Sequence, residues 1–519
     1  MRKFCFFSVI LGIFLTISAC GTKSKNEVNS EGNSTTAIVE VPREPTGTTL
    51  LGMGVEFDPH FFSQNLTRQD GARPEDWEIV RRRVSAMKVQ RFRVMLQPQW
   101  YEPVNDNDDP HSADFSRFTF DNAEMQSVCK VLDLAMETGA DVTLVLWGCP
   151  IWCDFVDAST PGHAQAYWLY DSHCPNWVSN PTDNEEFAEN FSSVAKYLIE
   201  EKGYTCIKEL TPFNEPDGNV CELDRYIEIC KLLDAHLRKD GIRDRISLNL
   251  SDNTDCRRWF LEGSAKELSA VADVFNSHTY IFGYDTPNDT VMRWERMNIE
   301  AVRGNGGGQV SHFVGEFGSN QCVGASRQTD INLYERGVLM VRHCINFLNA
   351  GAAGASYWGL IDQYYGRNAD YSQMQQLGLW RYVKAAYAPE DMSEDFTEDY
   401  RPRPQYYAYS LLTRSIRKGS KVYPLDLKSD FAAGTSVFGP DGKWCFAFAN
   451  GSGDPIAITL DPSGCQGGAP SRLALSRYAK DELPEDDSMI EPVQTLKRKN
   501  GKFFFELPAN SVVVLNHVK

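Results

Sequence analysis

Residues 207–216 read Ile-Lys-Glu-Leu-Thr-Pro-Phe-Asn-Glu-Pro, and residues 310–318 read Val-Ser-His-Phe-Val-Gly-Glu-Phe-Gly. Each stretch begins with a short β-branched and apolar run and ends at a glutamate, Glu215 or Glu316, next to turn residues. Short runs of this kind are typical of buried parallel strands. Both glutamates therefore fall at the C-terminal ends of predicted strands, where a parallel barrel places its functional groups. In mid-strand, each would be a buried charge without a partner.

The same strand pattern recurs along most of the chain and alternates with amphipathic helical patterns. Strands are predicted at 51–57, 90–96, 141–147, 207–213, 246–251, 271–278, 310–314 and 353–359. Eight strands that alternate with helices predict an α/β fold, a (β/α)8 TIM barrel, over residues 49–417. A doubly wound open sheet is the alternative. It usually has fewer strands and a glycine-rich turn after the first one, where this chain has Glu56-Phe57-Asp58-Pro59-His60.

From about residue 418 the helical spacing stops, and short alternating runs separated by turns take its place. Turn signals such as Pro440-Asp441-Gly442 and Asn450-Gly451-Ser452-Gly453 separate the runs. Strands are predicted at 421–427, 435–438, 443–449, 456–460, 472–476, 502–507 and 511–518. This pattern predicts an accessory domain over residues 418–519, an antiparallel β-sandwich.

The N-terminal residues 1–20 have the pattern of an export signal. Arg2 and Lys3 precede the apolar segment 4–15, which is too short to span a membrane as a helix. The small residues before Cys20 resemble the lipobox of bacterial lipoproteins, which implies cleavage at this site and lipidation of Cys20. An ordinary secretory signal is the alternative. Residues 21–48 are predicted to be a flexible tether. The protein is thus expected to be exported and membrane-anchored, in the periplasm or on the cell surface.

Composition narrows the possible partners. The formal net charge of −18 argues against a nucleic-acid partner, because phosphate binding needs clustered Lys and Arg. Aromatic residues form 12% of the chain, which suits a protein that handles neutral sugars. The 14 cysteines include no paired CxxC motifs, so most are predicted to be buried, with a few in disulfide bridges. We expect no metal and no cofactor, and the sequence gives no indication of the oligomeric state.

The two strand-end glutamates define a candidate active site. In a parallel barrel the C-terminal ends of all strands open on one face, so Glu215 and Glu316 are predicted to meet there. Two facing carboxylates can cleave a glycosidic bond, because one protonates the leaving oxygen while the other attacks carbon or activates water. Arg93, a charge in an otherwise apolar strand, would favour the ionised form of Glu316. Asn214 is a candidate ligand for a sugar hydroxyl next to the reacting carbon. His278 and Tyr280 end the sixth predicted strand and are candidates to orient Glu316.

The motifs Asn214-Glu215-Pro216, after the fourth predicted strand, and Gly315-Glu316-Phe317-Gly318, after the seventh, resemble those of glycoside hydrolase clan A. Within this clan the chain is similar to families 5, 30 and 39. The resemblance covers residues 50–360 and extends to the C-terminal β domain. It implies a retaining β-glycosidase that acts on carbohydrate without a metal, with Glu215 as the acid/base and Glu316 as the nucleophile.

The resemblance also implies roles for other side chains. Arg93 matches the clan's second-strand arginine, and Asn214 matches its ligand for the sugar 2-hydroxyl. Either His278 or Tyr280 matches the sixth-strand aromatic residue, and the choice between them stays open. Trp358 matches the eighth-strand tryptophan that floors the subsite next to the cleaved bond.

Several further residues have more than one interpretation. Trp147 either stacks on a sugar ring or belongs to the core. Glu56, Asp252 and Asp362 are candidates for binding sugar hydroxyls, whereas Glu209, in mid-strand, is interpreted as structural.

Two other functional classes compete with a glycosidase. A non-catalytic glycan-binding barrel would keep the fold but usually lose one of the two glutamates. A metal-dependent hydrolase would need histidine clusters at strand ends, and the nine histidines of this chain are scattered. The segment 361–401, long for a barrel loop, is predicted to form a wall of the substrate cleft.

Overall fold

The computed structural model describes residues 35–59, 74–147, 181–218, 221–255, 257–323, 327–364, 374–375, 377–381 and 400–518. The predicted signal segment 1–20 with its Cys20 lies outside the described residues, as does the first half of the predicted tether. Most of the segment 361–401 also lies outside them. The described residues belong to one structural unit, which begins at Thr35.

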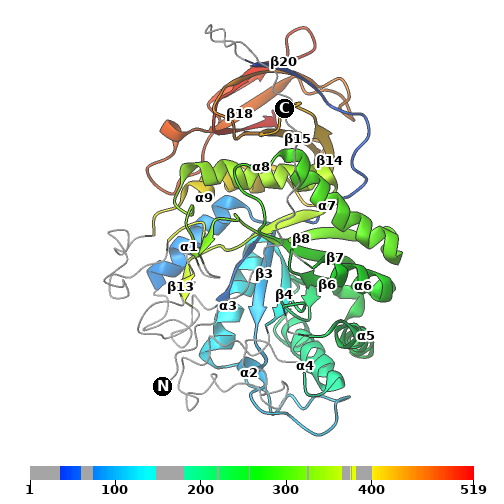
Figure 1. Ribbon diagram of the computed structural model, residues 1–519. Helices are drawn as coiled ribbons and strands as arrows, with labels where there is room; N and C mark the ends of the chain where they lie inside the picture. Colours follow the sequence, from blue (N-terminus) through cyan, green and yellow to red (C-terminus); the bar gives the residue numbers. More distant parts are fainter. Residues whose placement is uncertain are drawn as a thin grey trace, which may run out of the picture. The chain divides into compact units, whose positions relative to one another are not determined.

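Eight parallel strands close into a barrel in the order β11-β2-β3-β4-β5-β6-β7-β8 (Figure 1). They are β2 (Gly52–Glu56), β3 (Arg91–Leu96), β4 (Asp141–Leu146), β5 (Ile207–Thr211), β6 (Ser247–Asn253), β7 (Val274–Thr279), β8 (Ser311–Phe317) and β11 (Gly354–Tyr357). Tyr357 of β11 pairs with Val55 of β2, which closes the ring. Every residue of β2 and β3 is buried, as expected where helices cover the outside of a parallel barrel. The predicted TIM barrel is confirmed, and the open-sheet alternative is wrong.

Helices connect the strands and cover the barrel. They are α1 (Pro74–Met87), α2 (Pro98–Tyr101), α3 (Ala123–Thr138), α4 (Asn184–Lys196), α5 (Leu223–Lys239), α6 (Arg258–Leu268), α7 (Asn288–Val302), α8 (Tyr334–Ala350) and α9 (Pro404–Ser415), with short helical turns at Tyr197–Glu201, Arg243–Arg245, Arg303–Gly307 and Lys480–Glu482. Asn122 caps α3 by accepting a hydrogen bond from the backbone N–H of Met125 at 2.8 Å. Among the described residues, no helix combines the length and apolar character needed to cross a membrane.

The C-terminal part forms two facing sheets, as predicted. The larger sheet is antiparallel, in the order β14-β15-β16-β21-β18-β19, and the smaller has the order β1-β17-β20. The strands are β1 (Thr35–Glu40), β14 (Lys421–Leu425), β15 (Ala432–Phe438), β16 (Trp444–Asn450), β17 (Ile456–Asp461), β18 (Arg472–Tyr478), β19 (Gln494–Lys497), β20 (Phe503–Leu507) and β21 (Ser511–His517). Two short hairpins, β9 (Cys322–Val323) with β10 (Arg327–Gln328) and β12 (Gln363–Tyr364) with β13 (Met374–Gln375), follow β8 and β11.

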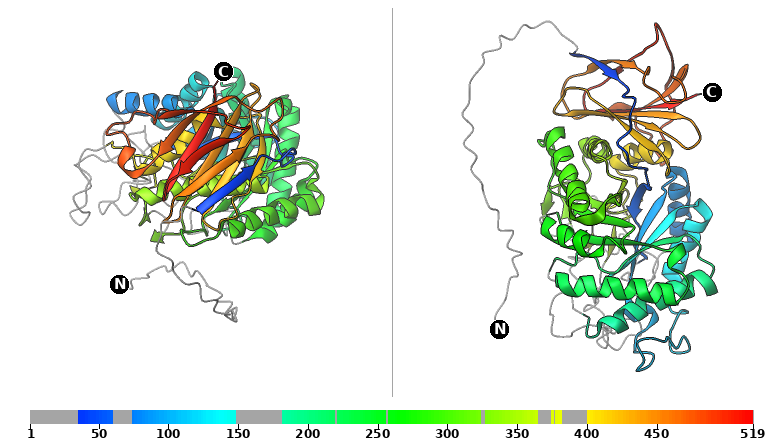
Figure 2. Two further views of the ribbon diagram at one scale, coloured as in Figure 1. Left: turned by 90° about the horizontal axis from the view of Figure 1, so that it is seen from above. Right: turned by 90° about the vertical axis from the view of Figure 1, so that its right-hand side faces the viewer.

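The strand β1 corrects two details of the sequence prediction. Residues 21–48 were predicted to be a flexible tether, but Thr35–Glu40 pair with β17 and lie beside the C-terminal strands (Figure 2). The pairing of β1 with β17 is parallel, so the smaller sheet is mixed and not purely antiparallel. Val39 of this strand is fully buried in the sandwich core, and this apolar contact stabilises the segment. The mostly polar residues around Val39 gave no indication of it in the sequence.

The sandwich joins the barrel at the N-terminal end of its strands. The backbone N–H of Leu50, just before β2, donates to the carbonyl of Ser420 at 2.9 Å. On the outside, the Tyr334 and Tyr478 rings stack with centroids 4.6 Å apart, and the Tyr478 hydroxyl donates to the Tyr334 carbonyl at 2.7 Å. In Figure 1, β3 and β4 run away from the sandwich toward α2 and α4. The C-terminal ends of the barrel strands therefore lie at the opposite end of the barrel from the sandwich.

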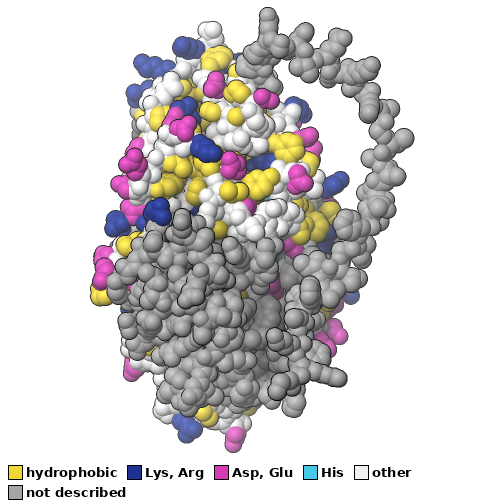
Figure 3. All heavy atoms as spheres, turned by 60° about the vertical axis from the view of Figure 1, so that its left-hand side comes forward, with side chains coloured by type: hydrophobic (Ala, Val, Ile, Leu, Met, Phe, Trp, Pro, Cys, Tyr) yellow, Lys and Arg dark blue, Asp and Glu magenta, His cyan; other side chains and the backbone are white. Residues whose placement is uncertain are grey.

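The described surface and cysteines agree with the composition. Figure 3 shows acidic and basic side chains interspersed on the described part of the face it presents, without a basic patch there. The cysteines whose side chains are described form no disulfide with one another, and all but the half-buried Cys129 are buried. They act as small apolar residues, and the few predicted bridges do not occur among them.

Candidate active site

The two predicted glutamates meet at the C-terminal end of the barrel. Glu215 follows β5, and Glu316 lies near the end of β8. A carboxylate oxygen of Glu215 lies within 4.8 Å of one of Glu316. The Glu215 side chain is 23% exposed and that of Glu316 only 7%, so one carboxyl opens to the mouth and the other lies below it. Glu215 has φ +45°, a left-handed conformation that is uncommon for a residue with a side chain and often found at functional sites.

The glycines of the Glu316 motif make room for neighbouring side chains. A Cβ atom on Gly315 would lie 2.4 Å from the side-chain oxygen of Asn276, and one on Gly318 would lie 2.8 Å from the Tyr280 ring. Larger residues at these positions would displace the groups that surround the carboxylate. The two glycines of the motif thus allow Asn276 and Tyr280 to pack closely against the backbone on either side of Glu316.

Arg93 is the centre of a buried network that we call the Arg93 cluster, made of Arg93, Glu56, Asn214, Asp252 and Glu316. Its Nη1 lies 2.9 Å from Glu56 and 2.7 Å from Glu316. Its Nη2 lies 2.7 Å from Asp252 and donates to the Asn214 amide oxygen at 2.8 Å. A single guanidinium makes all four contacts and so holds the carboxylates in place. Because it binds the amide oxygen of Asn214, the NH2 group of this side chain remains available to another acceptor.

His278, fully buried at the end of β7, joins this cluster to the second glutamate. Its Nδ1 lies 2.8 Å from Glu215 and 3.4 Å from Glu316, and its Nε2 lies 3.2 Å from Asp252. Burial lowers the pKa of the imidazole, but the charges of Glu316 and Asp252 outweigh this effect and raise it well above the usual value. His278 therefore carries a positive charge at neutral pH.

Tyr280, two residues further, approaches Glu316 from the same strand end. Its hydroxyl donates to Glu316 at 2.8 Å, and its backbone N–H donates to Asp255 at 2.8 Å. Both sixth-strand candidates of the sequence analysis thus contact the carboxyl pair in different ways. Tyr280 gives a neutral hydrogen bond to Glu316 alone, whereas His278 lies between the two glutamates.

Two carboxyls of the Arg93 cluster have opposite pKa shifts. Burial raises the pKa of Glu56 to about 8, opposed by Arg93 and reinforced by the charge of Glu316. Burial also acts on Asp252, but Arg93 and then His278 outweigh it and hold its pKa at about 2. At neutral pH Asp252 is therefore ionised and Glu56 is largely protonated.

Opposing effects act on the pKa of Glu316. Burial has the largest effect and raises this pKa; the charges of His278 and Arg93 lower it, and the charge of Glu215 raises it, so that the pKa lies above its usual value. Arg93 and Tyr280 both donate to the Glu316 carboxyl and stabilise a negative charge there.

The two tryptophans predicted at the mouth face each other. Trp147 follows β4 and Trp358 follows β11, and their rings stack with centroids 5.9 Å apart and an interplanar angle of 18°. The peptide bond between Trp358 and Gly359 is cis. The Trp358 backbone N–H donates to the carbonyl of Phe317, the residue after Glu316, at 3.3 Å. This contact brings Trp358 to the strand end that carries the buried glutamate.

The structure revises the roles suggested for the other acids. Glu56 and Asp252 were candidates for binding sugar hydroxyls, but both are buried partners of Arg93. Asp362 is also buried and forms an ion pair with Arg403 at 2.6 Å. Glu209 pairs with Arg91 inside the barrel, which confirms its structural role.

The sequence held a signal for one of these pairs. Glu56 and Arg93 are paired residues on the neighbouring strands β2 and β3. Aligning the two predicted strands by their ends could have indicated this pairing. Asp252 had no such signal, because it lies at a β-bulge where the pairing of β6 with β7 shifts.

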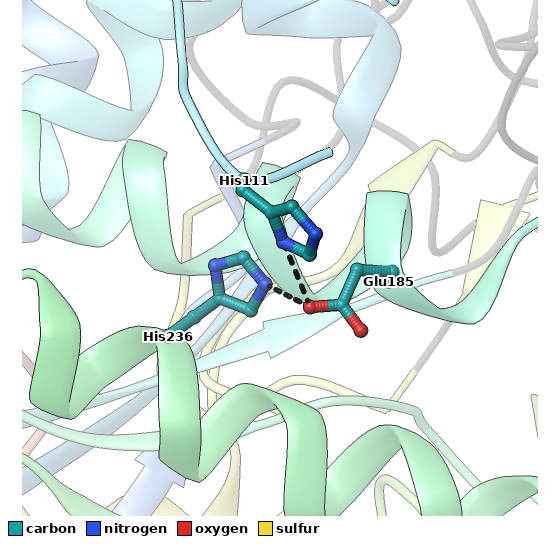
Figure 4. A group of neighbouring side chains, drawn as sticks. All are labelled: His111, Glu185 and His236. Atoms are coloured by element: carbon teal, nitrogen blue, oxygen red, sulfur yellow. Dashed lines mark hydrogen bonds and ion pairs between the residues drawn. The ribbon is translucent and has the colours of Figure 1, made fainter. Parts of the chain in front are cut away.

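Among the described residues, three groups of acids and histidines have the composition of metal sites, and two of them contain histidine. Glu215, His278 and Glu316 offer ligand atoms within 4.8 Å of one another, but the guanidinium of Arg93 already neutralises Glu316 and would repel a cation. The second group is His111, Glu185 and His236 (Figure 4). There Nδ1 of His111 and Nε2 of His236 lie 3.2 and 3.0 Å from the same oxygen of Glu185, so each histidine already has a partner.

Comparisons with known proteins support the fold. No protein-family model matches the sequence, and no curated protein matches it. A glycoside hydrolase family 30 subfamily 8 xylanase from Clostridium acetobutylicum superposes with TM-score 0.59 and 12% identity over 93% of this chain and 100% of that one. An endo-β1,6-glucanase gives TM-score 0.61 and 13% identity over 95% and 96% of the two chains. A family 39 glycoside hydrolase from Bacteroides cellulosilyticus gives TM-score 0.51 and 14% identity over 92% and 83%. These neighbours share the fold of this chain along nearly its whole length.

Proposed function

We propose that this protein is a retaining glycoside hydrolase that cleaves β-glycosidic bonds in oligo- or polysaccharides. The observation that supports this most directly is the separation of at most 4.8 Å between oxygens of Glu215 and Glu316. Retaining enzymes hold their two carboxyl groups about 5–5.5 Å apart, whereas inverting enzymes need about 6.5–9.5 Å to admit a water molecule. The unequal environments of the two carboxyls suit a double displacement.

In the first step, the ionised Glu316 attacks the anomeric carbon. Glu215 gives its proton to the glycosidic oxygen, the bond between that oxygen and the anomeric carbon breaks, and the leaving group departs as an alcohol. Glu316 is then joined to the sugar by an ester bond. Tyr280 and Arg93 hold the attacking carboxylate in place through their donors at 2.8 and 2.7 Å.

In the second step, Glu215 is ionised and takes a proton from water. The water oxygen attacks the anomeric carbon, the ester bond breaks, and Glu316 leaves as a carboxylate. Nδ1 of His278 lies 2.8 Å from Glu215 and can hold this side chain in place by a hydrogen bond. Both carboxyls return to their starting protonation states.

Two further features suit a carbohydrate substrate. Arg93 holds the oxygen of the Asn214 side chain, so its NH2 group is available to a sugar hydroxyl. The rings of Trp147 and Trp358 stack on each other at the strand ends and are 7% and 5% exposed, and we propose that this small exposed part contacts the sugar. The structural neighbours include xylanases and glucanases, which makes β-linked glycans the substrate class we propose.

We also propose that the chain is exported and anchored to a membrane by lipid on Cys20. The support is the N-terminal sequence alone, with its charged start, short apolar segment and lipobox-like Ile17-Ser18-Ala19-Cys20. Mass spectrometry of the membrane fraction should find the N-terminal peptide beginning at a diacylated Cys20. A Cys20→Ala variant should leave the membrane fraction, and an unchanged distribution would contradict the anchor.

A substrate screen tests the enzymatic proposal. We expect hydrolysis of at least one aryl β-glycoside or β-linked polysaccharide, with retained anomeric configuration by NMR. The Glu215→Ala variant should lose activity on poor leaving groups by about 10²–10⁴-fold and regain turnover with added azide. Glu222→Ala serves as the control, because this glutamate is exposed at the start of α5. Glycan binding without turnover would instead support the non-catalytic alternative, and inverted product would refute the double displacement.

A further inference from the structure

A second group of buried acids lies where the loop after α2 meets α4. Asp106 comes from the loop, and Glu186 and Glu189 lie three residues apart on one face of α4. Each of the three offers a carboxylate oxygen within 4.8 Å of the other two. The three residues are only 6%, 7% and 2% exposed. We call Asp106, Glu186 and Glu189 the Asp106 cluster.

No cation of the described chain compensates the Asp106 cluster. Among the described residues, no Lys, Arg or His forms an ion pair with any of its three members. The charged groups that act most strongly on Glu189 are Asp106, Glu186 and Asp240, all of them acids. Those acting on Glu186 are Asp106, Asp183 and Asp109. Three buried like charges without a counter-charge would cost several kcal/mol of stability, so a positive partner is required if they are ionised.

Two oxygens of the cluster also lack hydrogen-bond partners. Glu189 accepts a hydrogen bond from Ser193 through one oxygen only, and its other oxygen, Oε2, is buried without a partner. Oε1 of Glu186 is buried and unpartnered in the same way. Buried polar atoms normally find partners, because an unsatisfied one loses its hydration without compensation. These free oxygens therefore point to a ligand.

We propose that the Asp106 cluster binds a calcium ion. Calcium takes six to eight oxygen ligands at about 2.3–2.6 Å, so two oxygens on one ion lie at most about 5 Å apart, as the oxygens of this cluster do. Carboxylates provide only hard oxygen donors, and zinc sites usually include nitrogen or sulfur. Magnesium demands near-octahedral geometry and keeps several waters, which fits a buried cluster poorly.

The proposed ion would fasten a loop to a helix at the mouth of the barrel. The loop between α2 and α3 follows β3, and α4 follows β4, so both elements lie at the end where Glu215 and Glu316 meet. The same loop has a second, independent attachment through His111, which contacts Glu185 beside the cluster (Figure 4). The histidine attachment is complete with the side chains present, whereas the proposed cation would complete the attachment through the Asp106 cluster.

Calcium titration of the chelator-treated, full-length protein tests the site. We expect one calcium ion to bind in isothermal calorimetry and to raise the Tm by several degrees, with a smaller effect of magnesium. Asp106→Asn and Glu189→Gln should weaken calcium binding by at least about tenfold, since affinity follows the charge of the ligands. In EDTA these variants should be at least as stable as the original protein, because each removes a carboxylate from a repulsive group.

Glu201→Gln is the control, since it neutralises an exposed acid beyond the C-terminal end of α4 and leaves the Asp106 cluster intact. Its calcium affinity and calcium-dependent Tm shift should equal those of the original protein. Absence of calcium binding to the original protein would overturn the proposal. A calcium response of Glu189→Gln equal to that of the original protein would overturn the proposal as well, because the ion would then bind elsewhere in the protein.

Discussion

The Arg93 cluster and the Asp106 cluster bury similar acids at the same end of the barrel but compensate them differently. In the Arg93 cluster the guanidinium contacts three carboxylates and an amide within 2.9 Å, and His278 supplies a second positive charge. In the Asp106 cluster the strongest neighbouring charges are acids. Burial alone therefore does not define the role of an acidic side chain. That role also depends on which group supplies the compensating positive charge.

Counter-charges built into the chain allow chemistry without an added ion. Because Arg93 and His278 sit on rigid barrel strands, they can divide the protons unequally, leaving Asp252 ionised and Glu56 protonated. Acids on a loop and a helix, without such partners, instead offer their free oxygens to a ligand. We expect substitutions in the first group to affect turnover and folding, and those in the second to affect the response to a cation.

The largest expected effect separates the two clusters by activity. Glu316→Gln should lower kcat by at least about 10⁴-fold, because removal of a nucleophile removes the route through a covalent intermediate. Glu189→Gln should change kcat only a few-fold in the same assay with calcium present. Steady-state kinetics and circular dichroism of both variants make the comparison. Full activity of Glu316→Gln would show that the carboxyl is not the nucleophile.

The second largest expected effect is on the free energy of unfolding, which should depend strongly on Arg93. Arg93→Met removes the guanidinium from the buried Asp252 and Glu316 and leaves only His278 to compensate them, so urea unfolding should show a loss of about 3–5 kcal/mol. Arg81→Met is the control, because Arg81 pairs with Glu137 on the surface and its loss should leave the midpoint nearly unchanged. A loss below about 1 kcal/mol for Arg93→Met would mean that its acids are neutral and the ion pairs contribute little.

Acid should weaken the Arg93 cluster through Asp252. Its folded pKa of about 2 lies below the usual value of 3.8, so the folded state binds a proton less readily than the unfolded chain. The resulting stability is present above about pH 4 and is lost as the pH falls through 2, by about 2 kcal/mol. Between pH 5 and pH 3, urea unfolding should show about half of this loss, about 1 kcal/mol, in the original protein and a smaller one in Asp252→Asn. Equal losses would assign the acid sensitivity to other carboxyls.

The smallest expected effect concerns Glu56. Its folded pKa of about 8 lies above the usual value of 4.5, so between these pH values the folded state binds a proton that the unfolded chain has lost. Its contribution to stability is therefore fully present below about pH 4.5 and falls as the pH rises to 8. Glu56→Gln should be nearly neutral at pH 6 and should unfold with a flatter dependence on pH between 6 and 9. Strong destabilisation at pH 6 would show that Glu56 pairs with Arg93 as an anion.

The sequence alone determined the architecture and the central pair. Strand and helix periods are local properties, so each barrel strand and most strands of the sandwich could be located, and parallel closure then required Glu215 and Glu316 to share one face. β1 escaped prediction because its partner, β17, is far away in the chain and its neighbours are polar.

Which charged side chains contact one another depends on the tertiary structure. Arg93 collects acids from β2, β6 and β8, and Asp106 meets a helix that begins beyond residue 180. Such contacts depend on strand register, on a bulge at Asp252 and on the path of a loop, none of which has a local signature. Electrostatic interactions act over a few ångströms in space, so the protonation and ligands of these acids follow from three-dimensional proximity and not from order along the chain.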